Sequence, residues 1–325
     1  ISSSTHDYLV DPLAISDISS LGEIFASRTI QKVFHAAEYD IDCLKRDFSF
    51  AIANIFDTMI AGRTVGYRAV GLASMLEQAF GVKLDKRYQR ANWGQRPLKQ
   101  EMLEYARLDS HYLISLRQKL ITQLRKHKRL VLAEEDCERL CTNSVPMPNH
   151  TADIWRIRGA SDLKPMQLAA LKSVHDFREE LAKSNNKPPF KIMSNQALLE
   201  VAQTTPRYKE ELSLLPSLSP HQVQRFGKGL IQAVKNAGKA PAVFKQHYCR
   251  PDDDVLNRRE ILSDWRKHTG ETLGVQSDVV LPRDMMVQIA DNNPASLQEL
   301  SVVMADAPYR FEKFGKSIMM QLEGK

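Results

Sequence analysis

The pattern of apolar and polar positions changes near the middle of the chain. In the first third, short runs rich in β-branched and aromatic residues alternate with segments in which apolar residues recur every three or four positions. We expect strands at residues 8–11, 32–36 and 51–56, and helices at 17–27, 39–48, 70–82 and 99–127. Strands that alternate with helices are typical of an α/β domain with parallel strand pairing.

From about residue 150 the strand patterns stop, and a helical sequence occurs twice. Matching residues lie 88 positions apart without a gap, which indicates two copies of one small helical domain. The matching pairs are Phe177 and Trp265, Ala202 and Ala290, Pro206 and Pro294, Leu212 and Leu300, and Phe226-Gly227-Lys228 and Phe314-Gly315-Lys316. Each proline is expected to follow the end of a helix, because proline disfavours helical backbone in the residue before it.

These patterns divide the chain into three domains and two linkers. The stretches between the domains contain prolines and lack periodicity. The expected parts are a domain at 1–141, a linker at 142–160, a first helical domain at 161–240, a linker at 241–255 and a second helical domain at 256–325.

The overall composition is that of an ordinary globular protein, with 43% hydrophobic and 26% charged residues. A net charge of +6 is compatible with a polyanionic partner but does not require one. We expect no membrane span, because no apolar run approaches the roughly 18 residues needed. No signal peptide is apparent, and four scattered cysteines favour reduced thiols in a cytoplasmic protein. Because the chain begins at Ile1 and not at methionine, we expect it to be part of a longer protein.

Two regions carry candidate chemistry. Tyr105 and Asp109 are four residues apart in an expected helix, so both side chains lie on one helical face. Asp40 begins another helix, just after a strand, and ligands commonly bind at the carboxyl ends of such strands. Two carboxylates brought together could hold Mg²⁺. Taken singly, however, an aspartate in a first helical turn is more often a cap, and a tyrosine more often packs.

A longer set of ordered motifs extends around these residues. The set comprises "FHAAEYDIDCLKRDF" (34–48), "IFDTMIAGR" (55–63), Gly71-Leu72, "LDKRYQRANWGQRPL" (84–98) and "YARLD" (105–109). Together they resemble the ribonuclease D family of 3′→5′ exonucleases. The helical repeats are similar to HRDC domains, with Trp155-Arg156 opening the first copy. The resemblance covers nearly the whole chain, and it implies an α/β ribonuclease H-like exonuclease domain, N-terminally incomplete, followed by two all-α HRDC domains.

The resemblance also implies a catalytic site. In this family four acidic residues bind two divalent ions, Mg²⁺ or Mn²⁺, which carry the hydrolysis. Carried across, Asp40 is the acid of the second motif and completes the acidic cluster around the metals. Asp109 is the acid of the third motif and a direct metal ligand, and Tyr105 orients the attacking water.

Substrate contacts are implied for residues of the long loop and for His35 at the end of a strand. Gln89, Trp93 and Arg96 lie in that loop: Arg96 could contact a phosphate, and Trp93 could either stack on a base or pack beneath the loop. Asp57, which follows the third expected strand, is interpreted as a helix cap and not as a ligand.

One motif of the family has no counterpart in the sequence. The family's first motif is an Asp-x-Glu on the first strand, and it should lie upstream of Ile1. The sequence contains one Asp-x-Glu, Asp136-Cys137-Glu138, which follows the third motif and cannot replace the first. Without two of the four acids, we expect the chain as given to be inactive and the full-length protein to carry the activity.

The function expected from these observations is exonucleolytic trimming of RNA 3′ ends, with structured RNAs such as tRNA precursors as substrates. The helical copies would supply RNA affinity, and no obligate protein partner is expected. Two alternatives stay open. The protein could be a non-catalytic nucleic-acid-binding scaffold that uses its HRDC modules, or a DNA-directed exonuclease, because catalytic motifs do not read the 2′-hydroxyl.

Overall fold

The computed structural model describes residues 1–143, 154–238 and 250–323. We call these ranges the first domain, the first helical copy and the second helical copy. The chain forms two compact units. One unit contains residues 1–146 and 251–325, so it joins the first domain to the second helical copy, and the other contains residues 147–250.

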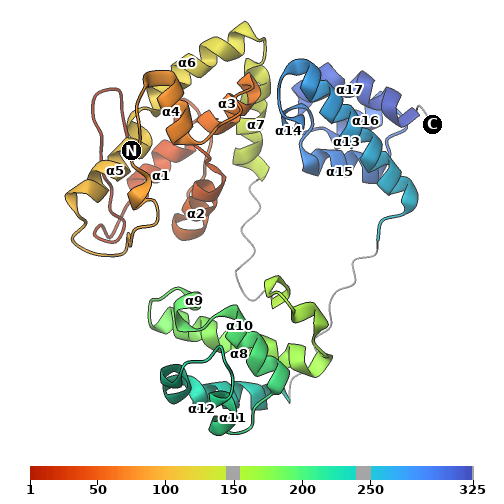
Figure 1. Ribbon diagram of the computed structural model, residues 1–325. Coiled ribbons are helices and arrows are strands. Elements are labelled where there is room, and N and C mark those ends of the chain that lie inside the picture. Colours follow the sequence, from red (N-terminus) through yellow and green to blue (C-terminus); the bar gives the residue numbers. More distant parts are fainter. Residues whose placement is uncertain (144–153, 239–249, 324–325) are drawn as a thin grey trace. The chain divides into compact units, whose positions relative to one another are not determined.

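The first domain arranges helices around two parallel strands (Figure 1). Its elements are α1 (Ser19–Ala26), β1 (Lys32–Phe34), α2 (Glu38–Phe48), β2 (Ile55–Asp57), α3 (Thr58–Val65), α4 (Leu72–Phe80), the 3₁₀ turn η1 (Lys86–Tyr88), α5 (Gln100–His111), α6 (Leu113–Lys126) and α7 (Leu130–Asn143). Strands β1 and β2 pair in parallel, with Val33 opposite Phe56. The predicted α/β character and parallel pairing are therefore confirmed.

Two expectations for the first domain are wrong. No strand forms at residues 8–11: Tyr8 and Leu9 are exposed, and the nearby extended pairing is a single antiparallel bridge between Ser2 and Asp7. The single helix expected at 99–127 is two helices, α5 and α6, which meet at Tyr112. The break lets the ring of Tyr112 stack on Phe80 while the leucines of α6 face the core.

Strand β2 lies at the centre of the first domain because both of its faces are buried. Phe56 belongs to an apolar cluster with leucines of α6, whereas Ile55 belongs to a second cluster with Ile41 of α2 and Cys137 of α7. A short strand buried on both faces reads as continuously apolar, as expected for parallel pairing. The strand therefore ends, at Asp57, in a position fixed from several sides.

The two helical copies repeat each other element by element. The elements of the first are the 3₁₀ turns η2 (Ile154–Arg156) and η3 (Ala160–Asp162), then α8 (Pro165–Ser184), α9 (Pro189–Ile192), α10 (Asn195–Thr204), α11 (Lys209–Ser213) and α12 (Pro220–Ala237). Those of the second are α13 (Asp253–Leu273), α14 (Ser277–Val280), α15 (Arg283–Asn292), α16 (Leu297–Val303) and α17 (Pro308–Glu323). Helices α10 and α15 end at left-handed residues with the same φ of 45°, Thr205 and Asn293. The predicted repeat is confirmed.

Part of the expected linker at 142–160 belongs to the first helical copy. Ile154 and Ile157 are buried in its core, which explains why the chain is already ordered there. Both expected linkers are also too long at their other ends, because α7 extends to Asn143 and α13 already begins at Asp253. Residues 144–153 of the first expected linker and 241–249 of the second lie outside the described residues. In the part of the chain that the structure describes, no helix combines the length and apolarity needed to cross a membrane.

Candidate active site

A cavity of about 910 Å³ opens in the first domain beside the end of β1. Five of the seven predicted site residues line it: His35, Asp40, Gln89, Tyr105 and Asp109. They come from a strand end, two helices and the long loop, which are far apart in the sequence. The fold therefore brings together most of the residues that the sequence singled out.

Local structure explains how the acidic residues reach the cavity. Tyr105 and Asp109 lie one turn apart on α5, so phenol and carboxylate share one face of that helix. After β1 the chain turns sharply through Ala36, whose φ of 59° is left-handed, and α2 then begins at Glu38. Asp40 lies in the first turn of α2 and is exposed toward the cavity.

The buried carboxylate of Asp57 fixes the turn between β1 and α2, which we call the Asp57 corner. One oxygen accepts the N–H groups of Met59 and Ile60 at 2.7 and 3.1 Å, which confirms the prediction that Asp57 caps a helix. The other oxygen accepts the N–H of Ala37 at 2.6 Å. Asp57 therefore joins the end of β2 to the start of the helix that carries Asp40. The sequence offers no signal for this second contact, because it links residues in different elements.

The ring of His35 has a defined orientation at the rim of the cavity. Its Nδ1 lies 2.9 Å from the hydroxyl oxygen of Thr58, and that hydroxyl donates its proton to the carbonyl of Phe34 at 3.0 Å. Because a hydroxyl has one proton, Nδ1 of His35 must donate to Thr58. Burial lowers the pKa of His35, so the ring is neutral and its Nε2 is a hydrogen-bond acceptor.

The two carboxylates of the cavity repel each other. The pKa of Asp109 is raised to about 6, chiefly by the surrounding protein and then by the charge of Asp40. The protein around Asp40 likewise raises its pKa by removing water from the carboxylate, with a further contribution from Asp57. The pKa of Tyr105 is raised by burial and by Asp109, so its phenol keeps its proton near neutral pH. A bound cation would relieve the repulsion between the acids.

Trp93 packs inside the loop and does not line the cavity. Its ring centroid lies 5.8 Å from that of Tyr105, and its indole N–H donates to the carbonyl of Tyr88 at 3.1 Å. Of the two roles considered for Trp93, this geometry favours packing. Trp93 and Tyr88 together support the ring of Tyr105 from the loop side.

Arg96 has a partner that the sequence did not suggest. Its guanidinium forms two hydrogen bonds with the carboxylate of Asp11, at 2.7 and 2.6 Å, and also donates to the carbonyls of Trp93 and Gln95. Arg96 therefore fastens the loop to the N-terminal segment, and the phosphate contact considered for it stays a prediction. The sequence alone does not pair Arg96 with Asp11, because the two residues lie 85 positions apart.

The donor set fits part of a divalent-metal site. Asp40 and Asp109 offer hard oxygen ligands of the kind that Mg²⁺ and Mn²⁺ prefer. The surrounding protein raises the pKa of both acids, and a neighbouring carboxylate raises each pKa further; a bound cation would favour their charged forms. Within residues 1–143, 154–238 and 250–323, no group of three or more histidine, cysteine, aspartate or glutamate residues is placed to hold a metal ion. The two acids therefore fit as members of a larger ligand set.

Comparison with known sequence families agrees with this picture. The family described as 3′-5′ exonuclease matches residues 1–125, and the HRDC domain family matches residues 167–234 and 255–320.

Individual relatives extend over most of the chain. An exosome complex component 10 homolog from Caenorhabditis elegans is 32% identical over 283 residues, which cover 86% of this chain and 32% of that protein. The chain thus spans about a third of that relative's length. Ribonuclease D from Pseudomonas paraeruginosa is 26% identical over 326 residues, covering 98% of this chain and 85% of that protein. The crystal structure of Escherichia coli RNase D superposes with a TM-score of 0.69 at 25% identity, covering 99% of this chain and 86% of that one.

The fold and the matched families define a 3′-5′ exonuclease domain followed by two HRDC domains. These domain matches, together with the ribonuclease D relative and structure, bear out the resemblance to the ribonuclease D family that the motifs predicted. The exonuclease domain of this family depends on a divalent metal.

Proposed function

We propose that the protein to which this chain belongs is a 3′-5′ exoribonuclease that hydrolyses RNA from its 3′ end. The observation that carries the proposal is the shared cavity of Asp40, Tyr105 and Asp109, three residues of two separate family motifs. Relatives named ribonuclease D, and an Escherichia coli structure described as an exoribonuclease involved in structured RNA processing, support RNA as the substrate.

Each of the five predicted site residues that line the cavity has a role in this proposal. Two divalent ions, Mg²⁺ or Mn²⁺, would supply an activated water and stabilise the leaving 3′ oxygen. Asp109 would hold a metal directly, and Asp40 would complete the negative charge around it. The protonated phenol of Tyr105 would hydrogen-bond the attacking water and orient it toward the phosphorus. His35, through its Nε2, and Gln89 would contact the terminal nucleotides.

We further propose that the helical copies bind the body of a structured RNA, such as a tRNA precursor, in the cytoplasm. Lys228 of the first copy and Lys316 of the second are exposed at the same position of the repeat. Lysines at such positions can neutralise RNA phosphates, and the net charge of +6 supports a polyanionic partner.

The proposal is tested with the full-length protein and a labelled RNA that carries a 3′ extension. We expect stepwise release of nucleotides in Mg²⁺ and none in EDTA, and we expect the 325-residue chain alone to be inactive. A matched DNA tests the sugar preference. Release that continues after chelation would contradict a metal-dependent mechanism, and binding of RNA without any release would favour a non-catalytic scaffold.

The role of Tyr105 is tested by Tyr105→Phe in the full-length protein. We expect kcat to fall by about 100-fold, as is typical when a group that positions a reacting proton is lost, while KM changes little. Tyr112→Phe is the matched control, because Tyr112 packs on Phe80 and does not line the cavity. A rise in KM with an unchanged kcat would instead assign Tyr105 to substrate binding.

The same assay addresses partners. We propose that the purified protein needs no obligate protein partner for activity. Relatives from Caenorhabditis elegans and mouse are named as exosome complex components, so an assembly is the alternative. Activity that appears only after a cell extract is added would favour the assembly.

A further inference from the structure

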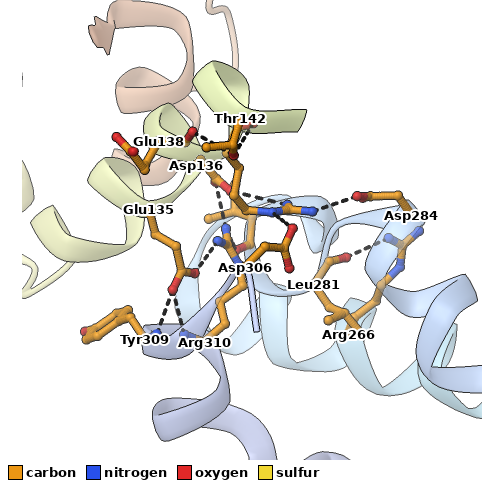
Figure 2. Close-up of polar contacts among 12 residues, drawn as sticks. Glu135, Asp136, Glu138, Thr142, Arg266, Leu281, Asp284, Asp306, Tyr309 and Arg310 are labelled. Atoms are coloured by element: carbon orange, nitrogen blue, oxygen red, sulfur yellow. Dashed lines mark hydrogen bonds and ion pairs between the residues drawn. The ribbon is translucent and has the colours of Figure 1, made fainter. Parts of the chain in front are cut away.

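Helix α7 has two functional faces. On one face Ala133 and Cys137 are buried against the first domain, and the sulfur of Cys137 accepts the N–H of Asp57 at 3.3 Å. The opposite face carries Glu135 and Asp136, which meet the second helical copy (Figure 2). The same helix therefore contacts both the strand behind the cavity and another domain.

The centre of this contact is a buried arginine. Arg310 of α17 is 0% exposed, and its guanidinium pairs with Glu135 and with Asp136, each at 2.7 Å (Figure 2). It also donates to the carbonyl of Val279 at 3.0 Å. A buried arginine requires such partners, because an unpaired buried charge strongly destabilises a fold.

Glu135 also caps the start of α17. Its second carboxylate oxygen accepts the N–H groups of Tyr309 and Arg310, at 2.7 and 3.3 Å. Amide groups in the first turn of a helix have no partner inside the helix, and the helix dipole favours a negative charge there. The carboxylate of Glu135 thus accepts hydrogen bonds from both the Arg310 side chain and the backbone at the start of α17.

Further ion pairs surround the centre. Arg139 of α7 binds Asp284 at 2.7 Å and Asp306 at 2.9 Å, and it is only 12% exposed itself. Arg63 of α3 pairs with Asp278 at 2.8 Å. Arg63 and Arg139 of the first domain therefore both meet acids of the second copy.

The two backbones also approach closely at one point. Gly66 ends α3 with a φ of 110°, and a Cβ at this position would lie 2.5 Å from the carbonyl oxygen of Gly274. The guanidinium of Arg129 joins the same region, because it donates to the carbonyls of Thr64 and Val65 and to that of Leu273. Shape and charge are therefore complementary across this interface.

The internal repeat provides a natural comparison. The first helical copy has the same fold, but uncharged residues occupy the equivalent positions of this face. Phe190, Gln196, Leu218 and Gln222 stand where the second copy has Asp278, Asp284, Asp306 and Arg310. Gln222 instead completes a capping box with Ser219 inside its own copy. The docking residues are thus a property of the second copy alone.

We infer that the second helical copy is a fixed structural part of the nuclease body, docked on α7 by Arg310, and that it stabilises the Asp57 corner through α7. The two copies then differ at this face: the second uses it to contact α7, whereas the first has uncharged residues at the equivalent positions. In the Asp-x-Glu sequence at 136–138, Asp136 pairs with Arg310 and Cys137 accepts the N–H of Asp57. This inference does not depend on catalysis.

Hydrogen exchange measured by mass spectrometry on the 325-residue chain tests the inference. Arg310→Met removes the charge from the centre and keeps the length of the side chain. We expect amides of α7, of the start of α17 and of Asp57 to exchange about 100-fold faster. Arg259→Met is the matched control, because it removes the pair with Asp291 inside the second copy and should leave those amides unchanged.

A variant on the opposite side separates undocking from unfolding. Glu135→Gln combined with Asp136→Asn leaves the second copy chemically intact, so α7 and α17 should again exchange faster while the core helix α15 stays protected. If Arg310→Met unfolds the second copy, this double variant decides the question. If exchange in both variants matches that of the control, the proposed docking of the second copy on α7 is wrong. If only the amide of Asp57 is unchanged, the proposed stabilisation of the Asp57 corner through α7 is wrong.

Discussion

The carboxylates of Asp40 and Asp109 show how the fold changes two ordinary side chains by bringing them to one cavity. Each is exposed toward the cavity, yet the protein around them and their mutual repulsion disfavour the charged forms. Because the pKa of Asp109 in the fold is raised to about 6, its protonated form favours folding at low pH. That contribution is present below the ordinary pKa and is lost as the pH rises through about 6. Metal affinity should change in the opposite direction and strengthen as Asp109 loses its proton.

The repulsion can be measured directly by removing one partner. Asp40→Asn should lower the pKa of Asp109 from about 6 toward its ordinary value, because the neighbouring charge is gone. Carbon-13 NMR titration of the side-chain carboxyl groups reports this pKa. Asp176→Asn is the control, since Asp176 is a half-buried residue of the first helical copy that pairs with Lys172 far from the cavity in sequence. An unchanged titration in the Asp40 variant would mean that burial alone raises the pKa of Asp109.

At the scale of elements, helix ends decide how the pieces of the first domain join. Helices α3 and α4 both end at glycines with positive φ, which residues with a side chain rarely adopt. The two glycines differ in their surroundings. A side chain at Gly81 would meet nothing within 4 Å, whereas one at Gly66 would collide with the backbone of the second copy. Gly66 is therefore required for conformation and for close approach, and Gly81 for conformation alone.

Alanine substitution distinguishes the two requirements. Gly81→Ala should lower the free energy of unfolding by about 1 kcal/mol, the usual cost of left-handed backbone in a residue with a Cβ. Gly66→Ala should cost roughly 3 kcal/mol, because the carbonyl of Gly274 must also move. Urea unfolding followed by circular dichroism measures both values. Equal losses would show that the interface yields without cost at this point.

At the scale of the whole molecule, the repeated domain is used in two ways. Leu212 and Leu300 occupy the same position of the repeat, and both are completely buried. The first lies in a compact unit made of residues 147–250, and the second lies in the unit that includes the first domain. The same position of the repeat therefore lies in the core of two different compact units, which we expect to unfold separately.

Paired substitutions should reveal this difference. Leu212→Ala and Leu300→Ala should each cost about 2–5 kcal/mol of stability through the cavity they leave. Hydrogen exchange should place the effect of Leu212→Ala within the first copy, whereas Leu300→Ala should also loosen α7 of the first domain. If α7 responds equally to both changes, the division into two cooperative units is wrong.

The sequence by itself predicted much of the fold because its signals are local. In the first domain, apolar periodicity located α1, α2, α4 and the segment that forms α5 and α6, and it placed both strands approximately. The 88-residue offset predicted the two copies, and four-residue spacing placed Tyr105 beside Asp109. Asp57 was recognisable as a cap because its partners Met59 and Ile60 are its neighbours in the chain. Such features depend on residues within a few positions of one another, and these are what a linear pattern records.

Only the tertiary structure decided the contacts that join distant segments. Asp57 reaches Ala37, Arg96 binds Asp11, and Arg310 pairs with Glu135 across a separation of 175 residues. The strand expected at 8–11 failed for the same reason, since a strand needs a partner that local propensity does not supply. Charged side chains are compatible with many surface positions, so their sequence does not indicate which of them will be buried together. Burial and pairing are set by how whole elements pack, and that packing fixed both the cavity and the docking of the second copy.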